Sequence, residues 1–354
     1  MKLGSYILQP RQPTLTIRMM KAPTPLSFLL TALFGFGLVV AEQAISQTIL
    51  RASHQFPGST GDVRDEMLQI IAREVEAANV GLIIRVYPGQ SLFKATDQWS
   101  ALVRGRLDIA LLPLDYASGR HPEFSATLMP GLVKNHDHAR RLNDSPFMED
   151  IKAIINEEGA RVLTDAWLAG GFTSSERCIL WPDDIQGQVI RAAGPAFERM
   201  MVAAGASITS MPSSEIYTAM QTGVLDAAST SSASFVTFRI HEHSECLTAP
   251  GEYGLWFMYE PVLIGERTWN RLDPEQQTAL LAAGKVAEDY FFEQAQLLDE
   301  HLEEVFTEAG VEIVHMTREQ TDAWRAIAAE TSYKVFAEEV PGGAELIEKA
   351  LAVE

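Results

Sequence analysis

Residues 182–191 read PDDIQGQVIR, and residues 211–226 read MPSSEIYTAMQTGVLD. The first stretch predicts a short strand over 189–191, and the segment between the two stretches predicts a helix over 196–204. A strand followed directly by a helix is the repeating unit of an α/β sheet. Arg191 closes the predicted strand. A permanently charged guanidinium at a strand end is a planar, two-pronged donor, which suits the recognition of a carboxylate.

The second stretch predicts a helix over 215–221. Ser213 or Ser214 is the expected N-cap, and Glu215 lies at the positive end of the helix dipole. A strand is expected over 224–228, directly after the helix. The helix and the strand continue the α/β alternation.

The same alternation begins after residue 47. Residues 107–112 read LDIALL and show no alternation of apolar and polar residues, as in a parallel strand that is covered on both faces. A chain of 354 residues exceeds one average domain, so two lobes are expected. The predicted elements of the first lobe are a strand over 48–53, a helix with an apolar stripe over 67–75, a strand over 82–87, a helix over 97–104 and the strand over 107–112.

The chain is expected to cross between the lobes near residue 167 and to return, by a strand over 255–259, near residue 255. The expected division is residues 47–167 and 256–295 for the first lobe, 168–255 for the second, and 296–354 for C-terminal helices that span both lobes.

A long helix is predicted from Pro274, with Asp273 as its N-cap, to about Gly310. At 1.5 Å per residue it would be roughly 50 Å long, more than one lobe needs. A spine helix along both lobes is therefore preferred. A coiled coil is the alternative, but Gly284 and Gln294 interrupt the apolar stripe.

The composition is that of a soluble globular protein, with 47% hydrophobic and 21% charged residues. The formal net charge of -19 argues against nucleic acid or an anionic membrane surface as a partner. For an anionic ligand the global field is repulsive, so the attraction has to be local.

The N-terminus resembles a targeting segment. Arg18 and Lys21 precede an apolar run over 26–41, which is shorter than the ~20 residues of a spanning helix and ends in small residues. Residues 1–46 are therefore interpreted as an upstream extension and a secretory signal peptide, and an uncleaved anchor is the alternative. The expected location is the periplasm, with no direct membrane insertion after cleavage.

Only two cysteines are present, Cys178 and Cys246. Both flank predicted strands of the second lobe and would meet an oxidising compartment. One disulfide and two buried free thiols both remain open.

No catalytic set stands out. His136 and His138, like His241 and His243, are two residues apart and lack the four-residue spacing of a zinc-binding helix. Nucleophile-elbow, phosphate-loop and dinucleotide-binding patterns are absent from the sequence. We therefore expect neither an enzyme, nor a metal site, nor a cofactor; a secreted metal-dependent hydrolase that uses these histidines is the remote alternative.

The order and spacing of the two opening stretches resemble the solute-binding subunits of tripartite ATP-independent periplasmic (TRAP) transporters, the dicarboxylate-binding-protein-like family. The resemblance implies an α/β, two-lobed periplasmic-binding-protein-like fold, type II like, with a long C-terminal spine helix. It also implies a cleft in which Arg191 holds an organic carboxylate, closure of the lobes by a hinge motion, and membrane subunits as partners. A similar module of a sensor kinase or of an ATP-driven importer is the alternative.

The chain departs from the family pattern at three site positions. Gly170 stands where many members have a second arginine, Ser213 replaces an aromatic residue, and Thr230 replaces an asparagine. The organic-anion class stays the expectation, while these departures weaken the case for a sugar acid or a dicarboxylate.

Further candidates come from the predicted lobe crossings and strand ends. Aromatic side chains there could stack on a ligand or exclude water. His54 follows the first strand, where α/β sheets place ligand contacts. The predicted ligand-binding residues are Arg191, Thr230, Ser213, Phe172, Tyr116, Trp256 and His54.

Overall fold

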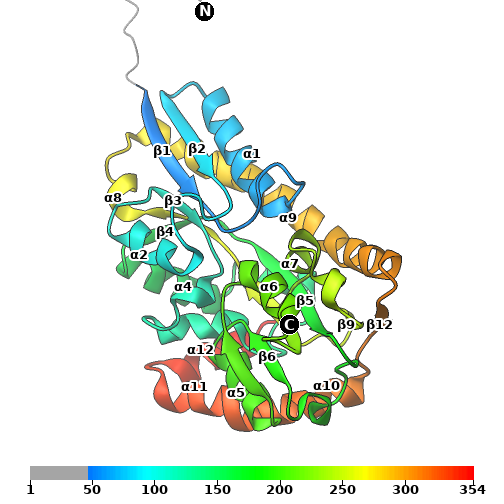
Figure 1. The fold of residues 1–354 in the computed structure, drawn as a ribbon. Helices are drawn as coiled ribbons and strands as arrows, with labels where there is room; N and C mark the ends of the chain where they lie inside the picture. The colour runs from blue at the N-terminus through cyan, green and yellow to red at the C-terminus, as the bar shows by residue number, and fades with distance from the viewer. Residues whose placement is uncertain (1–46) are drawn as a thin grey trace, which may run out of the picture. The chain divides into compact units, whose positions relative to one another are not determined.

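The computed structural model describes residues 47–354, and these form two β-sheets with helices packed around them (Figure 1). The predicted signal peptide and upstream extension, residues 1–46, lie outside the described residues. Within the described part of the chain, none of the helices is both long and apolar enough to cross a membrane.

The first sheet has five strands in the order β2-β1-β3-β11-β4. β1, β2 and β3 run parallel to one another, and β11 is antiparallel to its two neighbours. We call this sheet and the helices packed on it the first lobe. Its strands are β1 (Thr48–Ser53), β2 (Leu82–Tyr87), β3 (Ile109–Leu111), β4 (Ala160–Thr164) and β11 (Val262–Gly265).

Helices connect and cover this sheet. Asp62 caps the first helix by accepting a hydrogen bond from the backbone N–H of Arg64, and the predicted stripe that includes Met67 and Ile71 is buried. The helices are α1 (Val63–Ala77), α2 (Gln98–Val103), α3 (His136–Leu142), α4 (Pro146–Glu157) and α8 (Glu266–Trp269).

The second sheet has seven strands, with the path β12-β9-β5-β8-β6-β7 and with β10 paired to β5. We call it and its helices the second lobe. The strand that precedes the return to the first sheet, β10, still belongs to the second sheet. The strands are β5 (Trp167–Ser174), β6 (Val189–Ala192), β7 (Ser207–Ser210), β8 (Ala227–Ser231), β9 (Cys246–Thr248), β10 (Trp256–Tyr259) and β12 (Glu312–Val314).

Three helices pack with the strands of the second sheet. Two predictions made from the sequence for this region differ from the structure. The predicted N-cap of α6 is wrong, because Ser213 and Ser214 lie in a 3₁₀ turn and Glu215 occupies the cap without a side-chain bond. The strand predicted over 224–228 begins three residues later, at Ala227. The helices are α5 (Pro195–Ala203), α6 (Ile216–Gln221) and α7 (Ser232–Thr237).

The predicted spine helix is confirmed as α9 (Pro274–Glu308), and Asp273 and Gln276 form a capping box at its start. At 35 residues it is about 50 Å long. It packs on α1 and β4 in the first lobe and on β5, α7 and β12 in the second, a course that Figure 1 shows in yellow and orange. Gly284 permits the close approach, because a Cβ there would overlap the backbone carbonyl of Leu163.

The remaining chain packs against both lobes. α10 packs on α5 in the second lobe, and α12 packs on α4 in the first lobe. These helices therefore contact both lobes, as α9 does. The elements are α10 (Arg318–Ala328), a π-helical turn η7 (Ala329–Tyr333), α11 (Lys334–Glu339) and α12 (Gly343–Leu351).

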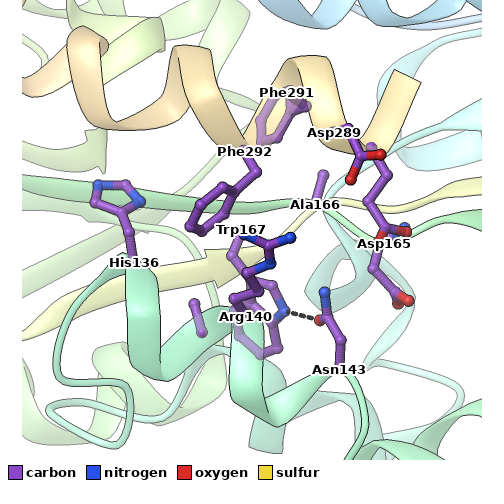
Figure 2. Close-up of a pocket in the computed structure, with 11 residues that line it drawn as sticks. His136, Arg140, Asn143, Asp165, Ala166, Trp167, Asp289, Phe291 and Phe292 are labelled. Carbon is purple, nitrogen blue, oxygen red and sulfur yellow. Dashed lines mark hydrogen bonds between the residues drawn. The ribbon is translucent and has the colours of Figure 1, made fainter. Parts of the chain in front are cut away.

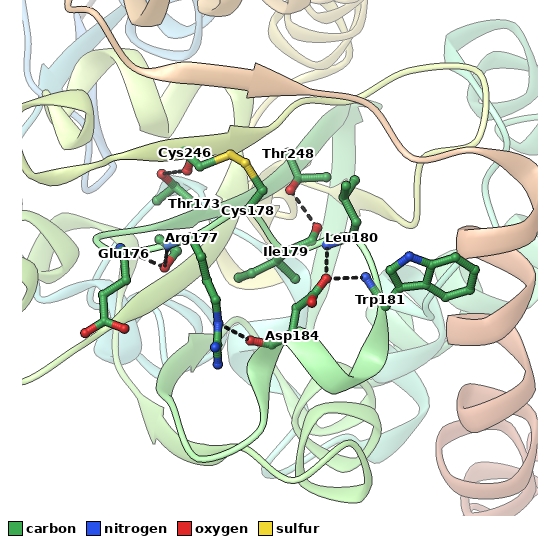
Figure 3. The surroundings of a disulfide bond; sticks show 11 residues. Thr173, Glu176, Arg177, Cys178, Ile179, Leu180, Trp181, Asp184, Cys246 and Thr248 are labelled. Atoms are coloured by element: carbon green, nitrogen blue, oxygen red, sulfur yellow. Dashed lines mark hydrogen bonds between the residues drawn. A yellow bond between two sulfur atoms is a disulfide. The ribbon is translucent and has the colours of Figure 1, made fainter.

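Cys178 and Cys246 form a disulfide, which resolves the alternative that the sequence left open. Figure 3 shows the bridge between β9 and the loop that follows β5, beside two threonine hydroxyls that donate to backbone carbonyls. Thr173 donates to the carbonyl of Cys246 at 2.8 Å, and Thr248 donates to that of Ile179 at 2.6 Å. The disulfide therefore fastens this loop to strand β9 of the second sheet.

Replacing both cysteines by alanine should lower the free energy of unfolding by about 4 kcal/mol, because the bridge closes a long loop in the unfolded chain. The bridged residues are 68 positions apart. Denaturant titration of the oxidised wild type and of the double variant measures the difference. Equal midpoints would show that the bridge contributes nothing to stability.

Candidate functional site

Arg191 lies in β6 and is almost fully buried, with 1% of its surface exposed. Its Nε donates to the carbonyl of Met211 at 3.0 Å, and its Nη1 donates to the carbonyl of Ser229 at 2.7 Å. Its Nη2 donates to the hydroxyl of Tyr116 at 3.2 Å. All three acceptors are neutral, so they position the guanidinium without neutralising its charge.

The charge of Arg191 has no carboxylate partner within ion-pair distance among residues 47–354. A buried charge without a counter-charge is costly. The arrangement therefore favours an anion from outside the chain.

Tyr116 connects the lobes at this point. It belongs to a 3₁₀ turn, η2 (Leu114–Ala117), that follows β3 in the first lobe. Its hydroxyl accepts from Arg191 and, at 3.0 Å, from the backbone N–H of Ser213, both in the second lobe. The side-chain amide of Gln55, from the first lobe, also donates to it at 3.4 Å. The Tyr116 hydroxyl therefore links the loop after β1 in the first lobe to Arg191 and Ser213 in the second lobe.

A cavity of about 210 Å³ lies beside Tyr116, and both lobes line it. Tyr116 and Met211 each bond to Arg191 and also line the cavity, so it begins one side chain away from the guanidinium. The first lobe contributes Thr96, Asp115, Tyr116 and Ser118, and the second contributes Ala192, Ala193, Gly194, Pro195, Glu198, Ser210, Met211 and Pro212.

Asp115 is a lining residue that the sequence did not indicate. Its side chain is buried, and neither carboxyl oxygen has a hydrogen-bond partner among the described residues. Burial and the nearby Glu198 raise the pKa of Asp115 well above its usual value, and the attraction of Arg191 does not offset them. The carboxyl lies against Gly194, where a Cβ would overlap its oxygens.

A second buried guanidinium, that of Arg64 in α1, has a different environment. Its Nε and Nη2 donate to the two oxygens of Asp62 at 2.9 and 2.7 Å, and its Nη1 donates to Ser234 at 2.9 Å. Burial alone would raise the pKa of Asp62, but the charge and hydrogen bonds of Arg64 lower it. This bidentate ion pair neutralises the charge of Arg64. Of these two buried arginines, Arg191 is therefore the one without a counter-charge among the described residues.

Glu260 lies beside Arg64, where the chain passes from β10 in the second lobe to β11 in the first. Its Oε2 is 3.7 Å from Nη1 of Arg64, and the side chain is fully buried. Burial raises the pKa of Glu260 to about 7; Arg64 opposes this shift, and Asp62 adds to it.

The raised pKa predicts that stability falls as the pH rises. Between about pH 4.5 and 7 the folded protein keeps a proton on Glu260 that the unfolded chain has lost, so the free energy of unfolding decreases over this window and the loss is complete above it. The expected loss is about 3 kcal/mol. Urea titrations at pH 5 and pH 8 should show it in the wild type and not in Glu260→Gln. The same pH dependence in both proteins would contradict the prediction.

Two more predicted site residues lie near Arg191. Ser213 is buried, and its backbone N–H binds Tyr116. Thr230 is buried in β8, next to Ser229, whose carbonyl holds Arg191. With Tyr116, they form the set of predicted residues that the structure brings together around the guanidinium.

Three other predicted residues lie apart from this group. Phe172 is in the core of the second lobe, where its ring stacks on Trp324 with centroids 5.9 Å apart. Trp256 is buried in the same core, opposite Gly170 in the β5–β10 register. His54 is buried in the loop after β1, and its two ring nitrogens bond to Asp65 and to the backbone N–H of Phe56.

The backbone geometry explains why no side chain occupies position 170. A Cβ on Gly170 would overlap the carbonyl oxygen of Thr230 and the ring of Trp256. The close packing of β5 against β8 and β10 therefore leaves no room for the second arginine that the family resemblance would place there.

Of the histidines that suggested a metal site, His136 and His138 bond to other groups of the protein. Figure 2 shows His136 at the edge of a pocket of about 30 Å³ between α3 and α9, in which Trp167 donates to Asn143. Nε2 of His136 lies 2.9 Å from Asp299, and Nε2 of His138 lies 3.0 Å from the carbonyl of Val353. Within residues 47–354, the one group with metal-like geometry is Cys178, Cys246 and Glu312, and its cysteines are joined in the disulfide.

Two α/β lobes, joined through a buried guanidinium and enclosing a cavity, define the class of solute-binding proteins. The chain belongs to the family of bacterial extracellular solute-binding proteins, family 7 (DctP), whose family model matches residues 60–339. The resemblance to TRAP solute-binding subunits, predicted from the sequence, is thereby confirmed, as is the two-lobed fold. This is a family of transport proteins rather than enzymes.

Relatives agree with this assignment. A solute-binding protein of Albidiferax ferrireducens is 36% identical over 309 residues, covering 86% of this chain and 91% of the relative. A TRAP periplasmic solute-binding protein from Rhodoferax ferrireducens, solved with bound malonate, is 37% identical, with a TM-score of 0.82 over 85% of this chain and 96% of the other. The protein of Sulfurospirillum deleyianum, solved with succinate, shares the fold at 24% identity, with a TM-score of 0.79 over 87% of this chain and 100% of the other.

Proposed function

We propose that this protein is the periplasmic receptor of a TRAP-type secondary transporter and captures a small organic carboxylate between its two lobes, with Arg191 as the anchor. The observation that carries the proposal is the buried guanidinium of Arg191, held by three neutral acceptors and without an ion pair among the described residues. A ligand carboxylate would supply the missing charge.

The relatives support an organic acid as the ligand. Those solved with a ligand hold malonate, succinate, uronates, gulonate or pyroglutamate. They do not favour a sensor module, an ATP-driven importer or a hydrolase. The closed receptor would deliver its ligand to the membrane subunits of the transporter, which draw on an ion gradient.

A panel of small organic acids, each paired with its primary amide, tests the proposal. The acid and the amide have nearly the same size, but only the acid supplies a negative charge. An acid at 100 times its Kd should raise the free energy of unfolding by about 2.7 kcal/mol, whereas its amide should have no effect. Thermal shift identifies the binders, and calorimetry measures them. Amides that bind as tightly as their acids, or a panel without any binder, would overturn the proposal.

A further inference from the structure

Asp115 has no role in the carboxylate-anchoring scheme, although it lines the same cavity as Tyr116. It is 3% exposed, and both of its carboxyl oxygens are buried without a hydrogen-bond partner in the part of the chain that the structure describes. Buried polar atoms are normally bonded, so an unpartnered pair at a cavity wall points to a ligand group that completes them.

The charged residues that line this cavity are both acidic. They are Asp115 and Glu198, and the lining contains neither lysine, arginine nor histidine. Glu198 accepts a hydrogen bond from Ser210 on the same wall. The cavity therefore has an acidic region, whereas Arg191 is outside its lining and bonds to the Tyr116 hydroxyl.

The two regions are close enough for one small molecule. Tyr116 and Met211 contact Arg191 and also line the cavity, whose volume is about 210 Å³. A ligand that presents a carboxylate to Arg191 would extend its other end past Tyr116 toward Asp115.

We propose that Asp115 is the specificity-determining residue of this receptor, selecting a monocarboxylate with a hydrogen-bond-donating group, hydroxyl or ammonium, at its far end over a dicarboxylate. The proposal rests on the proposed function, because it assumes that Arg191 holds the first carboxylate. It extends that function from organic acids in general to a narrower class.

Electrostatics give the reason for the selection. A second ligand carboxylate would join the two acids that already line the cavity, the buried Asp115 and the partly exposed Glu198, and like charges repel one another. Burial and Glu198 already raise the pKa of Asp115, and a second ligand carboxylate would raise it further, so the binding of a dicarboxylate favours proton uptake. A hydroxyl or ammonium group, in contrast, donates to the oxygens that lack a partner.

Two ligand series that differ only in the far group test the proposal by calorimetry at neutral pH. One series is propionate, 3-hydroxypropionate, β-alanine and malonate; the other is butyrate, 4-hydroxybutyrate, 4-aminobutyrate and succinate. In the wild type, the hydroxy or the amino acid should bind at least about tenfold more tightly than the dicarboxylate of the same length. Malonate is the critical competitor, because the relative from Rhodoferax ferrireducens was solved with it.

Variants at position 115 test whether Asp115 determines the preference for a hydroxy or amino acid over a dicarboxylate. Asp115→Asn should weaken an amino acid about tenfold, whereas a hydroxy acid should keep most of its affinity because the amide oxygen still accepts. Asp115→Leu should weaken both, and each variant should improve the relative affinity for the dicarboxylate. Asp97→Asn is the matched control, because Asp97 is an exposed acid next to the lining residue Thr96. This variant should leave the order of the ligand affinities unchanged.

A measurement on the wild type alone keeps the test decisive if a variant does not fold. Calorimetry in two buffers of different ionisation heat should show proton uptake with a dicarboxylate and none with a hydroxy acid. A wild type that binds malonate or succinate most tightly, without proton uptake, would overturn the role of Asp115 and leave the function of Arg191 intact. Absence of binding by every acid would overturn the proposed function, and this inference with it.

Discussion

Arg191→Ala should lower the affinity for the organic acid at least about a hundredfold. A guanidinium has five N–H donors, and three of those of Arg191 are bonded within the protein, which leaves one on Nη1 and one on Nη2. These two remaining donors can bind the oxygens of a carboxylate. Hydrogen bonds to a charged group contribute about 1.5–3 kcal/mol each, so the loss of two corresponds to about 10²-fold or more in Kd.

Two further variants make this experiment specific. Arg191→Lys keeps the charge but not the planar guanidinium, so its affinity should fall between those of the wild type and Arg191→Ala. Arg199→Ala is the matched control, because Arg199 is a partly exposed arginine in the neighbouring helix α5 and pairs weakly with Glu339 at 3.9 Å. Calorimetry on folded protein, checked by circular dichroism, gives the result. An alanine variant that binds within threefold of the wild type would remove Arg191 from the site.

Arg64→Ala should lower the free energy of unfolding by about 3–5 kcal/mol, the typical effect of removing one partner of a buried ion pair. The variant would leave Asp62 buried without its bidentate partner and Glu260 without its nearby cation. It would also remove the hydrogen bond to Ser234, which ties α1 to α7. Stability at neutral pH should therefore depend on this residue more than on any surface charge.

Arg73→Ala is the control on the same helix. Arg73 pairs with Glu66, but both side chains are largely exposed, so its loss should cost less than about 1 kcal/mol. Urea titrations of both variants give the comparison. Similar small losses in the two variants would show that the buried cluster does not stabilise the fold.

The sequence predicted those elements that have strong local patterns. Asp273 and Pro274 marked the start of α9, and the apolar stripe of α1 was recognisable because its buried face follows the helical period. Arg191 was placed in a strand because Val189 and Ile190 precede it, and the strand ends one residue later than predicted, at Ala192.

The errors arose where tertiary packing decides. β8 consists of Ala, Ser and Thr, and its residues are all buried between β5 and β6, so its composition does not indicate a strand. The apolar residues before it, Val224 and Leu225, instead bond to the carbonyl of Ala219 at the end of α6. Strand propensity therefore placed the element too early.

The buried ionisable residues could not be predicted for a similar reason. Asp115, Arg64 and Glu260 belong to ordinary-looking segments, and only the approach of distant strands and helices buries them. The pairing of the two cysteines likewise depends on contacts across 68 residues of sequence. Chemistry that depends on burial has no signature in a single stretch of sequence.

The hydroxyl of Tyr116 has a consequence for ligand entry. It receives donors from Arg191 and Ser213 in the opposite lobe, and the side chains of Gln55 and Ser214 bond across the same boundary. The lobes have to separate to admit a solute, and their separation breaks these hydrogen bonds. Any stabilisation that these bonds give to the closed receptor without ligand, but not to the liganded form, reduces the fraction of open receptors and weakens the apparent affinity by the same factor.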